Sequence, residues 1–177
     1  MTEQLQTRRL ILRSLRSADA SALLEARGDP EVMRFWDWPP QKTAAEVAKV
    51  IADHDSAIAQ GAVHWWAVTP APNGSAIGEC DISEIDRHNR RAELGFLFRR
   101  ASWGKGYARE AVEAVIDHAF GPLEIERLSA RIHSGNERAR RLLEKLGFSY
   151  EGMLHGYVLR EDLRIDCLVF GLLRDRR

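Results

Sequence analysis

The sequence has few of the residues and patterns that would mark several common classes of protein. It has two cysteines among 177 residues, and neither forms part of a CxxC or stands near histidines at zinc-ligand spacing. Lys plus Arg equals Asp plus Glu at 26 each, so no excess of one charge indicates nucleic acid or an anionic membrane as partner. We therefore expect Cys80 and Cys167 to be buried thiols in a reduced compartment.

Long apolar runs are missing as well. The opening MTEQLQTRRL lacks the apolar core of a signal peptide, and no run approaches the roughly 20 apolar residues of a membrane span. The six histidines are scattered, with no pair at ligand spacing, which predicts no metal site. These absences predict a cytoplasmic monomer or homodimer whose partners include neither nucleic acid nor a membrane.

What is present is the composition of an ordinary globular domain, with 45% hydrophobic and 29% charged residues. No linker, repeat or low-complexity tract divides the chain, so residues 1–177 are expected to form a single domain. Strand patterns cover 7–15, 63–69, 75–83, 91–98, 127–133, 150–159 and 164–173, and helical patterns cover 17–27, 43–58, 108–119 and 137–146. This order predicts an α/β fold built on a central mixed sheet.

Local signals refine these boundaries. Ser17 and Thr43 are expected N-caps, and Glu46 would complete a capping box with Thr43. Gly147 stands where a left-handed C-cap belongs. The residues 28–40, rich in Trp and Pro, and the residues 70–75 are expected to form a loop and a turn.

The most informative stretch is WGKGYA at residues 103–108, between a strand pattern and a helix pattern. Glycines there let backbone approach a ligand closely, and the first turn of a helix offers unpaired N–H groups at the positive end of its dipole. Lys105 adds a cation, so the stretch favours a diphosphate ligand. A tight turn with no ligand is the other interpretation, and neither GxxxxGK[ST] nor GxGxxG is present.

WGKGYA resembles the pyrophosphate loop of the GNAT superfamily of acetyl-CoA-dependent N-acetyltransferases. TRRLILR at 7–13, RAELGFLF at 91–98, NERARRLLEKLGF at 136–148 and the late Asp166 resemble, in the same order, the Rim-type branch that acetylates N-termini of ribosomal proteins. Trp103 departs from the general Gln or Arg of the loop, but it is frequent in that branch. The resemblance implies a GNAT-like domain with a mostly antiparallel, splayed sheet flanked by helices.

The resemblance also implies acetyl-CoA as cosubstrate and a set of residues that would hold it. The pantetheine arm would pair with backbone at Phe96, Leu97 and Phe98, and Asn136 would bond to it. The diphosphate would lie on amides of Trp103, Gly104, Lys105, Gly106, Tyr107 and Ala108. Asn136 is also a good N-cap for the helix that follows it, so a purely structural role stays open.

Glu93 is the candidate general base for attack of a neutral amine on the thioester, because it lies on the strand before the loop and on the face opposite Phe96. The other interpretation pairs Glu93 with Arg91 or Arg131. The usual acid of the family, a late-helix Tyr, is replaced by Leu143, and the branch's Ser is replaced by Ala139. Water, another residue such as Tyr150 or Tyr157, or no specific acid would then serve, since CoA thiolate is a fair leaving group.

Phe35, Trp36 and Trp38 give the segment 28–40 a high aromatic content and are the candidate acceptor-binding residues. They would hold a peptide or protein N-terminal α-amine, although they would serve equally well to cover the edge of the core. Three alternatives stay open: acetylation of a small amine, a sensor that binds acetyl-CoA without turnover, and an unrelated phosphate-binding protein.

Overall fold

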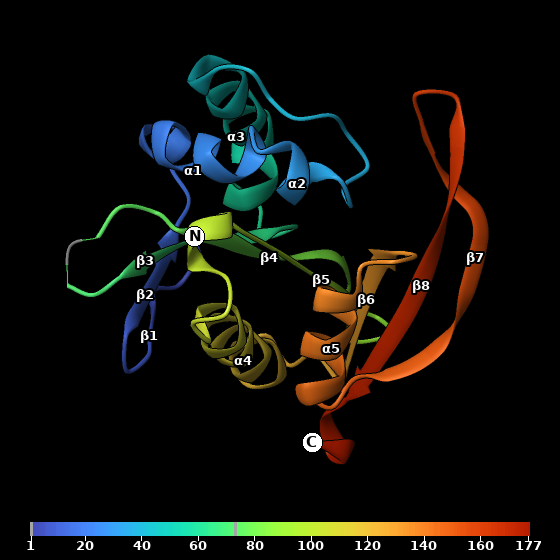
Figure 1. The fold of residues 1–177 in the computed structure, drawn as a ribbon. Helices are drawn as coiled ribbons and strands as arrows, with labels where there is room; N and C mark the ends of the chain where they lie inside the picture. The colour runs from blue at the N-terminus through green and yellow to red at the C-terminus, as the bar shows by residue number, and fades with distance from the viewer. Residues whose placement is uncertain (1, 73) are drawn as a thin grey trace.

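The computed structural model describes residues 2–72 and 74–177, and its centre is one eight-stranded sheet (Figure 1). The strand order is β1-β2-β3-β4-β5-β6-β8-β7. The strands are β1 (Leu5–Gln6), β2 (Leu10–Ser14), β3 (His64–Pro70), β4 (Gly78–Asp86), β5 (Arg91–Phe98), β6 (Arg127–His133), β7 (Ser149–Arg160) and β8 (Leu163–Leu173). Neighbouring strands are antiparallel except β5 and β6, which run parallel.

The helices form two layers on opposite faces of the sheet (Figure 1). The helices α1 (Ala20–Arg27), α2 (Pro30–Met33) and α3 (Ala44–Ala59) cover one face. The other face carries α4 (Tyr107–Phe120) and α5 (Glu137–Lys145). The β7–β8 hairpin extends beyond the body of the domain beside α2.

The two faces of the sheet differ in chemistry. On the α4 side the alternate residues Ala92, Leu94 and Phe98 of β5 join the largest core cluster, together with Val112, Val115 and Ile116 of α4. This burial follows from the periods of 2 in a strand and 3.6 in a helix. On the α1–α3 side the middle of the sheet is polar instead, and that face carries the candidate site.

The parallel strands β5 and β6 pair over a short distance only. Their register joins Arg91 to Arg127, Ala92 to Leu128 and Glu93 to Ser129. β6 then pairs with β8 along its full length, while β5 continues to Phe98 against β4. The two strands therefore part after Glu93, which confirms the expected splayed, mostly antiparallel sheet.

Several predicted boundaries are confirmed. β5 and β6 have the bounds that alternation predicted, and Gly147 has a positive φ of 92° after α5. Thr43 caps α3 by accepting from the Glu46 N–H at 3.2 Å. Cys80 and Cys167 are buried free thiols.

Other local predictions were wrong. Residues 30–33 form α2 rather than loop, because Asp29 caps the helix and Pro30 occupies its first position. Ser17 caps nothing: it begins a 3-10 turn, and Asp19 precedes α1. The Glu46 carboxylate accepts from the Lys42 N–H and not from the N–H of the N-cap residue Thr43, so the predicted capping box is incomplete. β4 begins at Gly78 rather than 75, and part of the expected turn over 70–75, Asn73, lies outside the described residues.

Within the described part of the chain, no helix is both long and apolar enough to cross a membrane.

Candidate functional site

The glycine stretch forms an open loop that ends at the N-terminus of α4. Gly104 and Gly106 have positive φ values of 75° and 78°, a region that favours glycine, and Gly106 is the N-cap of α4. A Cβ added at Gly104 would meet nothing within 4 Å. The residues from Gly104 to Gly106 are exposed, so the N–H groups of this loop and of the first turn of α4 are free to meet an anion.

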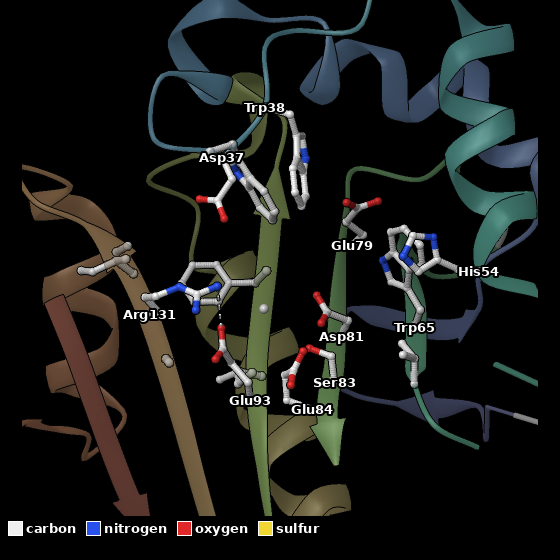
Figure 2. A pocket seen from close by; sticks show the side chains of 18 of the residues that line it. Asp37, Trp38, His54, Trp65, Glu79, Asp81, Ser83, Glu84, Glu93 and Arg131 are labelled. Atoms are coloured by element: carbon white, nitrogen blue, oxygen red, sulfur yellow. Dashed lines mark ion pairs between the residues drawn. The ribbon is translucent and has the colours of Figure 1, made fainter. Parts of the chain in front are cut away.

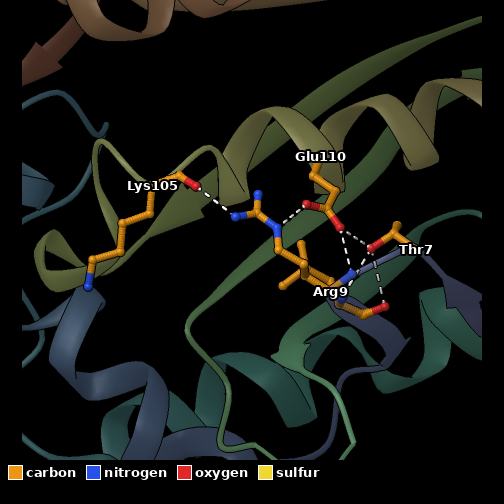
Figure 3. A network of polar contacts seen from close by, with 5 residues as sticks. Thr7, Arg9, Lys105 and Glu110 are labelled. Atoms are coloured by element: carbon orange, nitrogen blue, oxygen red, sulfur yellow. Dashed lines mark hydrogen bonds and ion pairs between the residues drawn. The ribbon is translucent and has the colours of Figure 1, made fainter.

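Arg9 of the N-terminal segment holds this loop from the side (Figure 3). Its guanidinium donates to the Lys105 carbonyl at 3.0 Å and to Glu110 Oε2 at 2.6 Å, and it lies over the Tyr107 ring at 4.7 Å. Glu110 also accepts from the Thr7 hydroxyl at 2.6 Å. Glu110 lies in the first turn of α4, where a carboxylate stabilises the helix N-terminus.

Trp103 connects the loop to its other neighbours. Its indole N–H donates to the Phe98 carbonyl at 2.9 Å, and the Arg138 guanidinium of α5 stacks on its ring at 4.6 Å. Asn136 caps α5 by accepting from the Ala139 N–H at 3.2 Å, which is the structural role that the sequence allowed. The strand end, the glycine loop and the start of α5 are thus joined on the α4 side of the splay.

A cavity of about 900 Å³ opens on the other side of the splay, beneath α1 and α3 (Figure 2). Aromatic side chains of Phe35, Trp36, Trp38 and Trp65 line it, together with Leu94, Gly95 and Phe96 of β5. Asn136 also lines it, so the cavity reaches the α5 end of the splay. Six carboxylates contribute to the lining against three arginines: Asp37, Glu79, Asp81, Glu84, Asp86 and Glu93, with Arg27, Arg91 and Arg131.

The deepest charges of the cavity form an ion pair. Arg27 Nη2 lies 2.5 Å from Glu79 Oε1, both side chains are almost fully buried, and the guanidinium lies over the Trp65 ring at 5.2 Å. Burial raises the pKa of the Glu79 carboxyl, and Arg27 opposes the rise. Two residues along β4, burial raises the pKa of Asp81 to about 7, although its side chain keeps contact with the cavity.

Arg131 lies opposite Glu93 across the splay. Its Nη2 is 3.6 Å from Glu93 Oε1, and its Nη1 donates to the Tyr157 hydroxyl at 3.1 Å. Burial raises the pKa of the Glu93 carboxyl; Arg131 opposes this, while Glu84 and Asp37 add to it. The surroundings of Glu93 therefore fit both interpretations of this residue. Its carboxylate is half-buried, as a general base requires, and it also forms an ion pair with Arg131.

The aromatic segment after α2 is held in place by two side chains, those of His133 and Arg160. His133 Nε2, at the end of β6, lies 2.8 Å from Asp37 Oδ1, and this hydrogen bond lowers the pKa of Asp37. Arg160 of β7 donates to the carbonyls of Met33, Arg34 and Trp36 at 2.9, 3.0 and 3.3 Å. Trp36 and Trp38 lie 6.5 Å apart between their ring centroids. The β7–β8 hairpin and the end of β6 thus fix one wall of the cavity.

The structure brings the predicted residues together in two groups. Trp103 to Ala108 form the loop on the α4 side, and Phe96 to Phe98 run from the splay toward it. Phe35, Trp36, Trp38 and Glu93 line the cavity, which Phe96 and Asn136 also reach. Within residues 2–72 and 74–177, no group of three His, Cys, Asp or Glu side chains is arranged to hold a metal ion.

Four further polar residues contact the loop or the cavity but were not predicted from the sequence: Arg9, Asp81, His133 and Arg138. Arg9 stands close to 100 residues before Glu110, and His133 meets Asp37 across 96 positions. Asp81 did carry a local signal, because it shares one strand face with Glu79 and Ser83 in a run of alternating polar residues.

Comparison with known proteins agrees with this arrangement. The family model described as an acetyltransferase (GNAT) domain matches residues 9–149. An uncharacterized N-acetyltransferase, p20 of Bacillus licheniformis, is 33% identical over 97% of this chain and 97% of its own. The spermidine N(1)-acetyltransferase of Escherichia coli K12 is 27% identical over 86% of this chain and 80% of its own. RimL, a ribosomal L7/L12 α-N-protein acetyltransferase solved with coenzyme A, superposes with a TM-score of 0.87 at 17% identity, covering 99% and 100% of the two chains.

The fold that carries this splayed sheet, glycine loop and cavity is the fold of an acetyltransferase domain. The chain is a member of the GNAT family and is an N-acetyltransferase, which transfers an acetyl group from acetyl-CoA to an amine.

Proposed function

We propose that the acceptor is a peptide or protein N-terminal α-amine, acetylated by direct attack in a ternary complex. The observation that carries this proposal is the cavity at the splay, which has an aromatic and acidic lining. An open cavity admits the end of a chain, while carboxylates favour the positive charge of an amine that has yet to lose its proton. Phe35, Trp36 and Trp38 form the wall against which the first residues would pack.

Acetyl-CoA would approach from the α4 side. We propose that its diphosphate lies on the amides of residues 103–108 and its pantetheine along Phe96, Leu97 and Phe98, whose outer edge is free of β6. Gly104 has open space above it, and Lys105 supplies an exposed cation, so the loop fits an anionic group. Asn136 would contact the pantetheine while it caps α5.

The chemistry then needs proximity, a proton acceptor and support for the developing negative charge on the carbonyl oxygen. A backbone N–H of the free edge of β5 would supply that support. Glu93 lies on the cavity face of β5 at the point where the strands part, which keeps it a candidate for handling the amine proton. The late-helix position Leu143 is fully buried, so we assign no protein acid to the CoA thiolate.

A polyamine is the second candidate acceptor. Six carboxylates in one cavity suit an acceptor with several ammonium groups, and a relative at 27% identity is named a spermidine N(1)-acetyltransferase.

The test is CoA release with purified protein, acetyl-CoA and three acceptors: a peptide with a free N-terminus, the same peptide with a blocked N-terminus, and spermidine. The proposal expects release with the free peptide and loss of release with the blocked one. Release with spermidine but with neither peptide would indicate that the acceptor is a polyamine and not an N-terminal α-amine. Binding of acetyl-CoA without release in any mixture would exclude both proposed acceptors.

A further inference from the structure

One face of β4 places the carboxylate of Asp81 at the floor of the cavity. Glu79, Asp81 and Ser83 point to the same face because strand residues alternate. Glu79 is taken up by its buried ion pair with Arg27. Asp81 lies between Glu79 and Ser83 and faces the cavity (Figure 2). It is therefore the carboxylate of this face that stays available to a ligand.

The position of Asp81 relative to β5 is fixed by a glycine. Asp81 pairs with Gly95 across the β4–β5 register, and a Cβ added at Gly95 would collide with the Asp81 carboxylate. The carboxylate thus lies over the β5 backbone two residues past Glu93, where β5 has left β6, and directly before Phe96. This is the place where the proposed pantetheine path meets the acceptor cavity.

We infer that Asp81 takes the proton from the attacking amine, and that Glu93 is a positioning residue that holds Arg131. In this step the amine nitrogen bonds to the acetyl carbonyl carbon, and its proton passes to the Asp81 carboxylate directly or through one water. The carbon–sulfur bond breaks, and its electron pair leaves on the sulfur of CoA. The inference rests on the proposed function and names the group that performs its proton transfer.

The charges around Asp81 support this role. Burial raises its pKa to about 7, the neighbouring Glu79 and Glu93 add to the rise, and Ser83 and Arg27 oppose it. At physiological pH a base with a pKa near neutrality is ionised in roughly half of the molecules and is a stronger proton acceptor than an ordinary carboxylate. His54 of α3 lines the same cavity, but the carboxyl whose pKa it lowers is that of Glu79. Burial raises the pKa of Glu93 as well, but the Arg131 guanidinium at 3.6 Å opposes that rise and engages its carboxylate.

A polar route leads the proton away from Asp81. Ser83 follows on the same face, and Glu84 comes next at a break in the β4–β5 register, with a φ of 50°. Such a bulge redirects a side chain, and Glu84 is an exposed residue of the cavity lining. Asp81 can therefore return its proton to water after each turnover.

The test is the pH dependence of CoA release, from about pH 5 to about pH 9, with saturating acetyl-CoA and the acceptor that supports turnover. The wild-type protein should show kcat/KM rising through an apparent pKa near 7. Asp81→Asn should lower kcat by about 10²- to 10⁴-fold and abolish this rise, with the Kd of acetyl-CoA unchanged. Glu93→Gln, the matched control, should keep the rise but move it to lower pH, because Glu93 adds to the pKa of Asp81.

Ser83→Ala is a second variant that leaves every carboxylate in place. Since Ser83 lowers the pKa of Asp81, this variant should move the rise to higher pH. The inference is overturned if Asp81→Asn keeps the wild-type rate and rise, or if Glu93→Gln abolishes the rise while Ser83→Ala leaves it in place. No CoA release by wild-type protein with any amine would instead contradict the proposed function, and the inference with it.

Discussion

The contribution of Asp81 to the stability of the fold depends on pH. Folding buries its carboxylate, which favours the protonated form, and its pKa rises from 3.8 to about 7. The folded state therefore binds this proton more tightly than the unfolded state does. Such a group stabilises the fold fully below the unfolded pKa, and this contribution is lost as pH rises through the folded pKa.

We predict that Asp81→Asn stabilises the protein increasingly between about pH 4 and about pH 7, relative to wild type. The wild-type carboxylate should cost roughly 2 to 4 kcal/mol once it is ionised, whereas the Asn cannot ionise. Thermal unfolding at stepped pH measures the difference in Tm, which should grow across this window and level off above it.

The control for this series is Asp86→Asn, because hydrogen bonds from Asn89 and then Arg91 lower the pKa of Asp86 to about 2. A lowered pKa gives stability that is lost only as pH falls through the range from about 4 to 2, so this variant should show no growing gain. A constant difference between Asp81→Asn and wild type would contradict the environment assigned to Asp81.

At the scale of elements, the glycine loop is held by segments that are distant in sequence. Arg9 reaches it from the stretch between β1 and β2, and Arg138 reaches it from α5. A loop with two left-handed glycines has few contacts of its own, so these arginines fix its shape before a ligand arrives. Preorganisation of this kind increases affinity by reducing the ordering cost of binding.

We predict that Arg9→Met weakens acetyl-CoA binding by about threefold to tenfold, because one charged hydrogen bond to the loop carbonyl is lost. Met keeps an unbranched apolar side chain but loses the guanidinium that lies over Tyr107. Arg8→Met is the matched control, since Arg8 is exposed and one position away. Calorimetry gives both values of Kd; an equal effect of the two variants would indicate loss of general positive charge instead.

The start of α5 offers a second test at this scale. Asn136→Ala should remove the N-cap and destabilise the fold by about 1 kcal/mol, whereas Asn136→Ser should keep a capping oxygen. If Asn136 also contacts pantetheine, both variants should bind acetyl-CoA more weakly. Urea unfolding and calorimetry separate the two effects, and wild-type affinity of Asn136→Ser would leave capping as the role of this residue.

At the scale of the whole molecule, the sheet separates two environments. Its α4 side is an apolar core, and its α1–α3 side holds the acidic cavity, with the splay of β5 and β6 as the connection. A cosubstrate and an acceptor that arrive from opposite faces would therefore meet at one point. The architecture itself supplies the proximity that acyl transfer needs.

Much of this architecture could be predicted from the sequence, because it depends on local patterns. Alternation over 91–98 gave the bounds of β5, and the glycines marked the loop before α4. The polar network could not be predicted, since contacts such as Arg9 with Glu110 and Asp37 with His133 depend on the tertiary fold. α2 was missed because its capping signal, Asp29 before Pro30, stands in a segment that otherwise has loop composition.

The most direct test of the account is a calorimetric titration of acetyl-CoA into the wild-type protein, Gly106→Glu and Lys105→Glu. Gly106→Glu adds a carboxylate and a strained backbone, while Lys105→Glu reverses an exposed charge without touching the core. Gly152→Glu, at a position of β7 with a positive φ and open space around it, controls for the added charge and for the strained glycine backbone. The account predicts micromolar binding by wild type and Gly152→Glu, and at least tenfold weaker binding by both loop variants. Equal affinity of all four proteins would contradict the assignment of the glycine loop as the diphosphate site.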